Sequence, residues 1–164
     1  MMGKFSDACA IMFPLNKNPG DFPTLMMGFL GKANIWHWKA NRDREYWSGQ
    51  EFNEKAYADY HYPFEDKETL PVSKDVLTSA VNDLISIRVT TITPKEAQNV
   101  AGKGIWSDGA WQVVFKRAIE PLDPELDAGF ADVKRLCAFA VWNGDKGDRG
   151  GRKSISDWVE LEIR

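Results

Sequence analysis

The chain has 164 residues, of which 43% are hydrophobic and 27% are charged, and its formal net charge is −3. This length favours one globular domain, and the composition excludes a disordered chain, a collagen-like repeat and a coiled coil. Interspersed charges with an acidic balance argue against a nucleic-acid or anionic-lipid binder. No apolar stretch approaches the ~20 residues that a membrane-spanning helix needs, so no membrane span is predicted.

The first half of the chain contains three short segments that we interpret as strands. Residues 7–13 are apolar and are followed by Pro14, which indicates a buried strand. Residues 24–27 and 34–40 form the next two predicted strands and are linked by a glycine turn. Residues 41–81 are polar and show no sustained period, so we expect a long excursion with a short helix near residues 73–79.

The second half has the same strand character. Residues 84–93 form a predicted strand that Pro94 ends. Ser107-Asp108-Gly109 is a tight-turn signal that predicts a hairpin between residues 105–106 and 111–119. The last two predicted strands are residues 135–142 and 157–163. Many short strands with little helical periodicity predict a mainly β fold, an antiparallel β-sandwich with long loops.

The aromatic residues and the two cysteines indicate what the protein core contains. The seven tryptophans favour a β-rich core or a flat-faced ligand site, and composition does not choose between them. Cys9 and Cys137 both lie in apolar alternating segments. We expect buried thiols, with a disulfide between neighbouring core strands as the alternative. The first residues lack the pattern of a secretory signal.

Residue counts and missing motifs argue against several familiar catalytic sites. His37 and His61 are the only histidines and neither lies in a zinc-hydrolase or c-type haem motif. No nucleophile elbow or P-loop is present, and we predict no catalytic residue.

Three other features could form a binding site. Trp36 and Trp38 share one face of their strand, either as a core pair or as the wall of a flat pocket with Lys39 at its edge. The Met26-Met27 pair is core filler or a soft ligand suited to haem iron. Lys116 lies opposite Trp111, Val113, Phe115 and Arg117, and is either a surface residue or a desolvated amine.

Three segments, TLMMGFLGKANIWHWKA, AGKGIWSDGAWQVVFKRA and AFAVWNGDKGDRGGRKSIS-W, resemble the haem b-binding gamma subunits of the type II dimethyl sulfoxide reductase family. That group includes ethylbenzene and dimethyl sulfide dehydrogenases and the selenate and chlorate reductases. The resemblance implies a single haem-binding β-sandwich over residues 1–164 and a non-catalytic electron-transfer role in a periplasmic heterotrimer. Its expected partners are an iron–sulfur subunit, a molybdopterin catalytic subunit and a soluble cytochrome-type carrier.

The resemblance also implies residue roles. The axial ligands of haem b would be a methionine, matched at Met27 with Met26 as the alternative, and a lysine. Lys116 matches the lysine best, with Lys39 and Lys103 in other matching segments. Lys39 and Arg117 would pair with haem propionates, and the expected pocket walls are Trp36, Trp38, Trp111 and Phe115.

Relative to that family the sequence starts late, so we expect N-terminal strands of the sandwich and an export signal to be lacking here. The alternative function is a carbohydrate-binding β-sandwich that stacks tryptophan and tyrosine rings on sugars.

Overall fold

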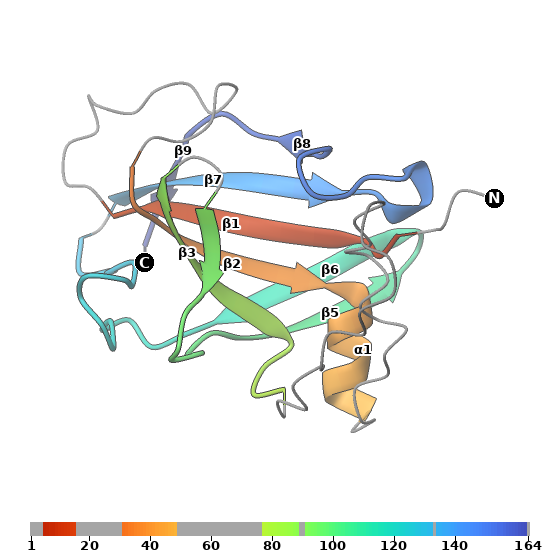
Figure 1. The fold of residues 1–164 in the computed structure, drawn as a ribbon, viewed down its shortest axis with the longest axis horizontal. Helices are drawn as coiled ribbons and strands as arrows, with labels where there is room; N and C mark the ends of the chain where they lie inside the picture. Colours follow the sequence, from red (N-terminus) through yellow and green to blue (C-terminus); the bar gives the residue numbers. More distant parts are fainter. Residues whose placement is uncertain (1–4, 16–30, 49–76, 89–90, 133, 164) are drawn as a thin grey trace, which may run out of the picture.

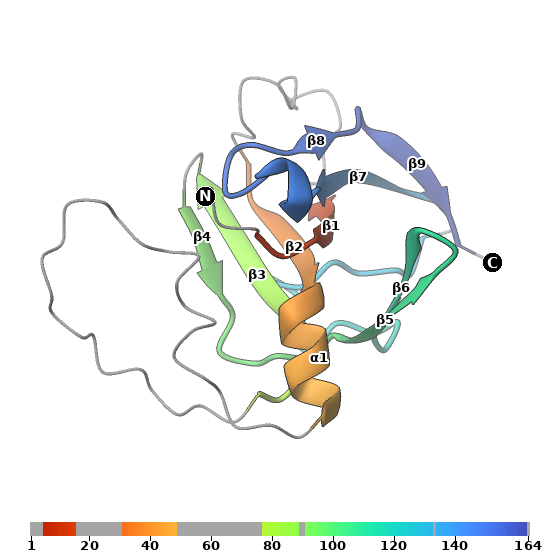
Figure 2. The ribbon, with the colours of Figure 1, turned by 90° about the vertical axis from the view of Figure 1, so that its right-hand side faces the viewer.

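The structure is a computed structural model that describes residues 5–15, 31–48, 77–88, 91–132 and 134–163. Two antiparallel sheets face each other (Figures 1 and 2). The larger sheet has the strand order β4-β3-β2-β1-β7-β8, and β9 also pairs with β7. Its strands are β1 (Ala8–Pro14), β2 (Ala33–Lys39), β3 (Val81–Arg88), β4 (Thr91–Pro94), β7 (Lys134–Trp142), β8 (Ser154–Ile155) and β9 (Val159–Glu162).

The smaller sheet is a hairpin of β5 (Ala101–Ser107) and β6 (Ala110–Lys116). Its two-residue turn has Asp108 and Gly109 at φ 52° and 79°, the left-handed values that a tight hairpin turn requires. A helix, α1 (Ala40–Ser48), follows β2, and a 3-10 turn (Gly144–Lys146) follows β7. We call the face of the larger sheet that is turned toward the hairpin the inner face, and the opposite one the outer face.

Alternation along the strands sorts side chains between these two faces. Trp36 and Trp38 point inward into the core, and Trp38 is only 1% exposed. The core cluster is completed by other buried side chains of the inner face and of the loops around it, namely Phe13, Val81, Val100, Ala128 and Cys137. The predicted faces of the 34–40 strand and the antiparallel β-sandwich class are therefore confirmed.

A buried carboxylate fastens the hairpin to the larger sheet. Asp43 of α1 accepts hydrogen bonds from the Trp38 indole N–H (2.7 Å) and from the Gly104 amide (2.9 Å). A Cβ on Gly104 would collide with the Trp38 ring, so only glycine allows β5 to approach so closely. One polar side chain thus joins α1, β2 and β5.

A second polar cluster lies at the other side of the core. The Lys95 amine is bound to the carboxylates of Asp83 (2.9 Å) and Asp127, and all three side chains are buried. Buried polar groups are tolerated when they are paired and hydrogen-bonded, as these are. The cluster ties β3 to the loop that precedes β7.

Two predictions about elements need correction, and two others fall wholly or mostly outside the described residues. The single strand predicted over residues 84–93 is instead the antiparallel pair β3 and β4, with a register shift between Ser86 and Arg88. Helix α1 occupies part of the segment that was predicted to lack regular structure. The predicted strand 24–27 and most of the predicted helix 73–79 fall outside the described residues. Both cysteines are free thiols, as expected.

Candidate functional site

The inner face carries a cleft with two lobes between the sheets. The first lobe, near the hairpin turn, has a volume of about 500 Å³ and includes Cys9, Trp38, Trp106, Trp111 and Lys146 in its lining. The second lobe, of about 460 Å³, lies at the opposite end of the hairpin, and Val113 borders both lobes. Residues lining the second lobe are mostly apolar: Ile11, Phe13, Trp36, Phe115, Ile119, Phe130, Leu161 and Ile163, with Arg117 and Glu162.

The structure brings the predicted pocket walls together in two groups. Trp38 and Trp111 meet edge to face in the first lobe, with ring centroids 4.9 Å apart. Trp36 and Phe115 meet in the second lobe at 6.3 Å, beside Arg117. Because Trp36 and Trp38 are buried, this pair offers no exposed platform on which a sugar ring could stack.

Arg117 is held deep in the second lobe. Its guanidinium lies 5.3 Å from the Trp36 ring and 5.0 Å from the Phe130 ring, and its side chain is only 2% exposed. The Nη2 group donates to the Ala128 carbonyl, and Nη1 lies 3.7 Å from an Asp127 carboxylate oxygen. Burial lowers the pKa of the guanidinium, and the charge of Asp127 works against that shift.

Lys116 lies on the opposite side of β6 from the cleft. Alternation along the hairpin turns Lys116 and its neighbour Val114 away from the larger sheet, together with Lys103 of β5. Of the two alternatives for Lys116, a surface residue or a desolvated amine, the structure favours the first, because Val114 is 66% exposed and Lys116 is exposed too. Lys116 lines neither lobe. The Lys103 amine lies 4.8 Å from the Trp47 ring of α1.

The outer face presents small side chains at its centre. The register of β1 and β7 pairs Ala10 with Ala140 and Met12 with Ala138. Ala8, Ala10 and Ala138 are buried. On β2, Ile35, His37 and Lys39 share this face. Short side chains therefore line the centre of this face, and longer side chains from β2 and from the end of β7 flank them.

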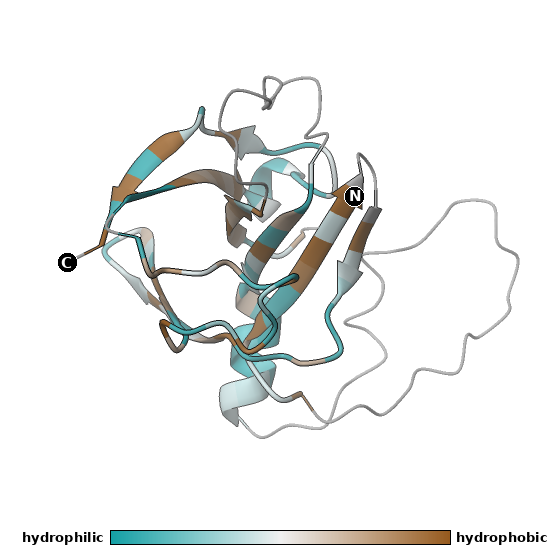
Figure 3. Cartoon of the chain, turned by 90° about the vertical axis from the view of Figure 1, so that its left-hand side faces the viewer, coloured by the Kyte–Doolittle hydropathy of each residue, from teal (hydrophilic) through white to brown (hydrophobic). Residues whose placement is uncertain are grey.

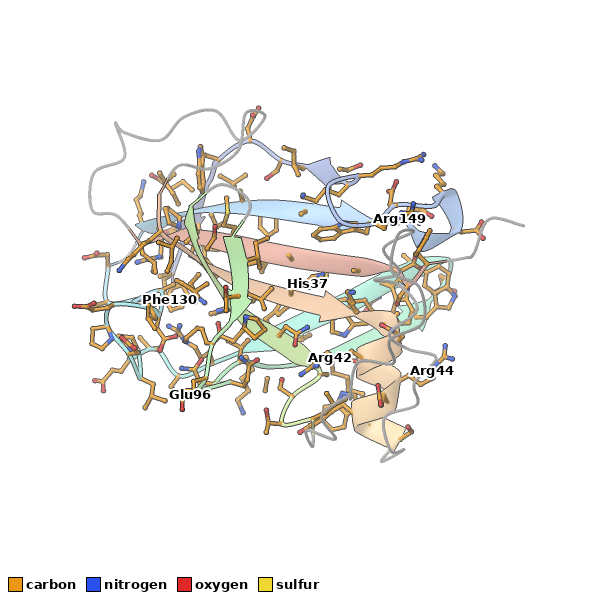
Figure 4. All side chains as sticks on the ribbon, in the orientation of Figure 1. His37, Arg42, Arg44, Glu96, Phe130 and Arg149 are labelled. Carbon is orange, nitrogen blue, oxygen red and sulfur yellow. The ribbon has the colours of Figure 1, made fainter. Side chains whose placement is uncertain are left out.

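His37 lies on β2 in the middle of this outer face (Figure 4). Its ring is 5.1 Å from the Trp142 ring, and the Lys153 amine lies 5.4 Å from the same indole. Burial, followed by the charges of Lys39, Arg42 and Lys153, lowers the pKa of His37 to about 4. The imidazole is therefore neutral at pH 7, and three cations surround it.

The two faces differ in the donors that they could offer to a metal. Among the described residues that line the second lobe, the charged groups are Arg117 and Glu162, and neither is a soft or nitrogen ligand. The lining of the first lobe includes the Lys146 amine and the Asp7 and Asp145 carboxylates. Burial raises the pKa of the Cys9 thiol in that lobe to about 11, so the thiol stays protonated. The outer face offers the His37 imidazole, the Met12 thioether and the amines of Lys39 and Lys153. It thus brings together imidazole, thioether and amine donors, which suit haem iron.

Lys153 and the position of His37 on the outer face were not predicted from the sequence. The signal for Lys153 was present, because this lysine lies in the third family-like segment, directly before Ser154. Its position beside Trp142 depends on how the loop after β7 returns to β8, which no local pattern encodes. The predicted ligands Met26 and Met27 lie outside the described residues.

Comparison with known proteins places the chain in a family. A respiratory nitrate reductase heme subunit of Haloferax mediterranei, provisionally named so and designated ORF7, is 28% identical over 96% of this chain and 44% of its own length. The chlorate reductase subunit gamma of Ideonella dechloratans is 22% identical over 98% of this chain and 52% of its own length. The chain thus spans about half the length of these curated relatives. The ethylbenzene dehydrogenase family profile matches residues 1–154, and the chain therefore belongs to the ethylbenzene dehydrogenase family.

Proposed function

We propose that this chain binds haem b and transfers electrons within a molybdenum oxidoreductase complex. The family membership and the names of the two relatives, a nitrate reductase heme subunit and a chlorate reductase gamma subunit, support this role. The structural observation that carries the proposal is the donor set of the outer face. His37, Lys39 and Lys153 lie there beside the alanines of β1 and β7.

The proposed haem ligands are Met27, with Met26 as the alternative, and a lysine. Lys116 remains the lysine predicted from sequence. On the donor geometry we propose Lys153 in its place, because its amine is next to Trp142 and His37 on the outer face. Lys116, by contrast, lies on the far side of the hairpin from the larger sheet.

The remaining residues of the outer face would orient the cofactor and tune it. When bound, the haem supplies reversible one-electron chemistry, and its potential is set by ligands, burial and nearby charge. Ala10 and Ala140 allow a flat ring to approach the strands, where larger side chains would hold it away. Lys39 and Arg42 supply positive charge for the propionates. Neutral His37 adds no charge of its own at pH 7.

The proposed setting is a periplasmic complex. Its other members would be an iron–sulfur subunit and a molybdopterin catalytic subunit, with a soluble cytochrome-type carrier as the further redox partner. This chain would hold no catalytic residue and would only relay electrons. Among the described helices, none has the length and apolar character needed to cross a membrane.

Absorption spectroscopy of the haem-reconstituted chain tests the proposal. Binding of one haem per chain with a sharp Soret band is expected, and Lys153→Gln should change the position of that band and weaken haem binding about tenfold or more. Lys116→Gln is the matched control and should leave the spectrum unchanged. A chain that takes up no haem with its partner subunits present would overturn the function. A spectrum altered by Lys116→Gln but not by Lys153→Gln would overturn only the choice of lysine.

A further inference from the structure

The second lobe of the inner cleft has the composition of a ligand site that the haem proposal does not use. It has a volume of about 460 Å³, within the range of ~300–1,000 Å³ typical of small-molecule pockets. Its walls are aliphatic and aromatic, with Trp36, Phe115 and Phe130 among them. Such walls favour an apolar ligand body.

One polar group in this lobe is buried without a full set of partners. The Nη1 atom of Arg117 is inaccessible to solvent and makes no hydrogen bond within the described part of the chain. Its distance of 3.7 Å from Asp127 allows attraction but is too long for a hydrogen bond. A buried N–H without an acceptor costs free energy, and a bound acceptor would recover it. Arg117 lines the lobe, so such an acceptor can come from a ligand.

The surrounding charges favour an anion at this position. Arg117 shares the Asp127 carboxylate with Lys95, which also binds Asp83. Arg135 brings a third cation close by, because its guanidinium lies 5.7 Å from the Phe130 ring. The Nε atom of Arg135 is also buried and makes no hydrogen bond to any described residue.

Three cations around two buried carboxylates leave a positive excess. Burial, followed by the charge of Arg117, lowers the pKa of Arg135. Two further acidic groups reduce this excess: Asp132, which is exposed and acts on the charge of Arg135, and Glu162, which lines the lobe.

We propose that the second lobe binds an amphipathic carboxylic acid, with its carboxylate on Arg117 and its apolar body between the two sheets. A guanidinium presents parallel N–H groups that match a carboxylate, and a charge-assisted bond in a dry site is among the stronger polar contacts. The acid would be of medium-chain or aryl size, as the volume requires. The inference does not depend on haem binding.

Titration with decanoate, followed by quenching of tryptophan fluorescence and by calorimetry, tests this site. Decanoate should bind at least tenfold more tightly than decanol, which has the same chain without the carboxylate, and acetate should not bind measurably. Arg117→Gln should remove that preference. Equal affinity for decanoate and decanol in the unaltered protein would overturn the proposal.

A second variant keeps the test valid if Arg117→Gln unfolds the chain. Ile119 lines the lobe and is 64% exposed, so Ile119→Trp should be tolerated while filling the entrance. It should weaken decanoate binding about tenfold, whereas Val114→Trp on the outer side of the hairpin should have no effect. Equal effects of the two substitutions on decanoate affinity would contradict the assignment of the binding site to the second lobe.

A haem propionate could supply the same carboxylate chemistry. The titration is therefore repeated on protein loaded with one equivalent of haem. Unchanged decanoate affinity supports a separate site. Stoichiometric displacement of decanoate by haem would overturn it, because Arg117 would then hold a propionate.

Discussion

At the scale of single residues, His37 should make the stability of the fold depend on pH. Its folded pKa of about 4 lies below the ordinary value of 6.5, because burial and three neighbouring cations oppose protonation. Between these values the unfolded chain binds the proton more readily. The free energy of unfolding should therefore fall as the pH is lowered through this window, by about 2 kcal/mol from pH 6.5 to 5.

Urea unfolding at several pH values checks this prediction, and His37→Gln should remove most of the dependence in that window. An NMR titration of the imidazole reports the folded pKa directly. A midpoint near 6.5 would contradict the assigned environment.

Gly104 shows a residue-scale constraint that comes from close packing. Gly104→Ala should destabilise the fold by about 1–3 kcal/mol, because the added methyl group would collide with the buried Trp38 ring. Gly151→Ala is the control, since a Cβ there meets nothing within 4 Å. Chemical denaturation of both variants gives the comparison. Equal stabilities would show that β5 can move away from Trp38 at little cost.

The direction of a side chain could be predicted from the sequence wherever it follows from the local period of a strand. The inward direction of Trp36 and Trp38, and the grouping of Trp111 with Phe115, follow from the two-residue period of a strand. The burial of Arg117 among Trp36, Phe130 and Asp127 could not be predicted, because these partners come from distant segments. The same period also placed Lys116 opposite Phe115, but it did not show that this side of β6 is exposed.

At the scale of elements, helix α1 explains why a polar segment was mistaken for a loop. Among its residues only Asp43 is buried, so the helix has no apolar stripe that a periodicity search could detect. The division of residues 84–93 into β3 and β4 was missed for a related reason. Apolar and β-branched residues continue through the register shift, so composition does not mark the break.

The buried Lys95 cluster should contribute to stability far more than an exposed ion pair. Asp127→Asn should cost about 3–5 kcal/mol, because Lys95 and Arg117 would lose a buried counter-charge. The control is Glu160→Gln, which breaks an exposed pair with Lys134 (2.6 Å) and should cost less than about 1 kcal/mol. Urea denaturation midpoints of the two variants test the difference. A smaller cost for Asp127→Asn than for Glu160→Gln would contradict it.

At the scale of the whole molecule, the two sheets differ greatly in width. The hairpin leaves part of the inner face of β7 and β9 uncovered, and the apolar residues there include Phe139 (40% exposed) and Val141 (52% exposed). Figure 3 shows hydrophobic and hydrophilic residues alternating along β9. The pairing of Val159 with Cys137 and of Leu161 with Arg135 places both on the inner face. We call these four residues the open strip.

The open strip should make the chain associate with itself when it is produced alone. Apolar patches of this kind are uncommon on soluble monomers. Val141→Glu should shift the sedimentation-velocity distribution toward the monomer. Ile92→Glu, at an exposed apolar residue of β4, serves as the control. Identical distributions for the unaltered chain and Val141→Glu would show that the strip does not drive association.

The tie made by Asp43 has a mechanical consequence for the cleft. It fixes β5 against β2 beside α1, and the indole of Trp111, at the start of β6, donates to Asp7 just before β1 (3.0 Å). Both strands of the hairpin are therefore bonded to the rest of the molecule beside the first lobe. Widening of the cleft there would have to break at least one of these buried or partly buried hydrogen bonds, so the first lobe should keep its width when a guest enters.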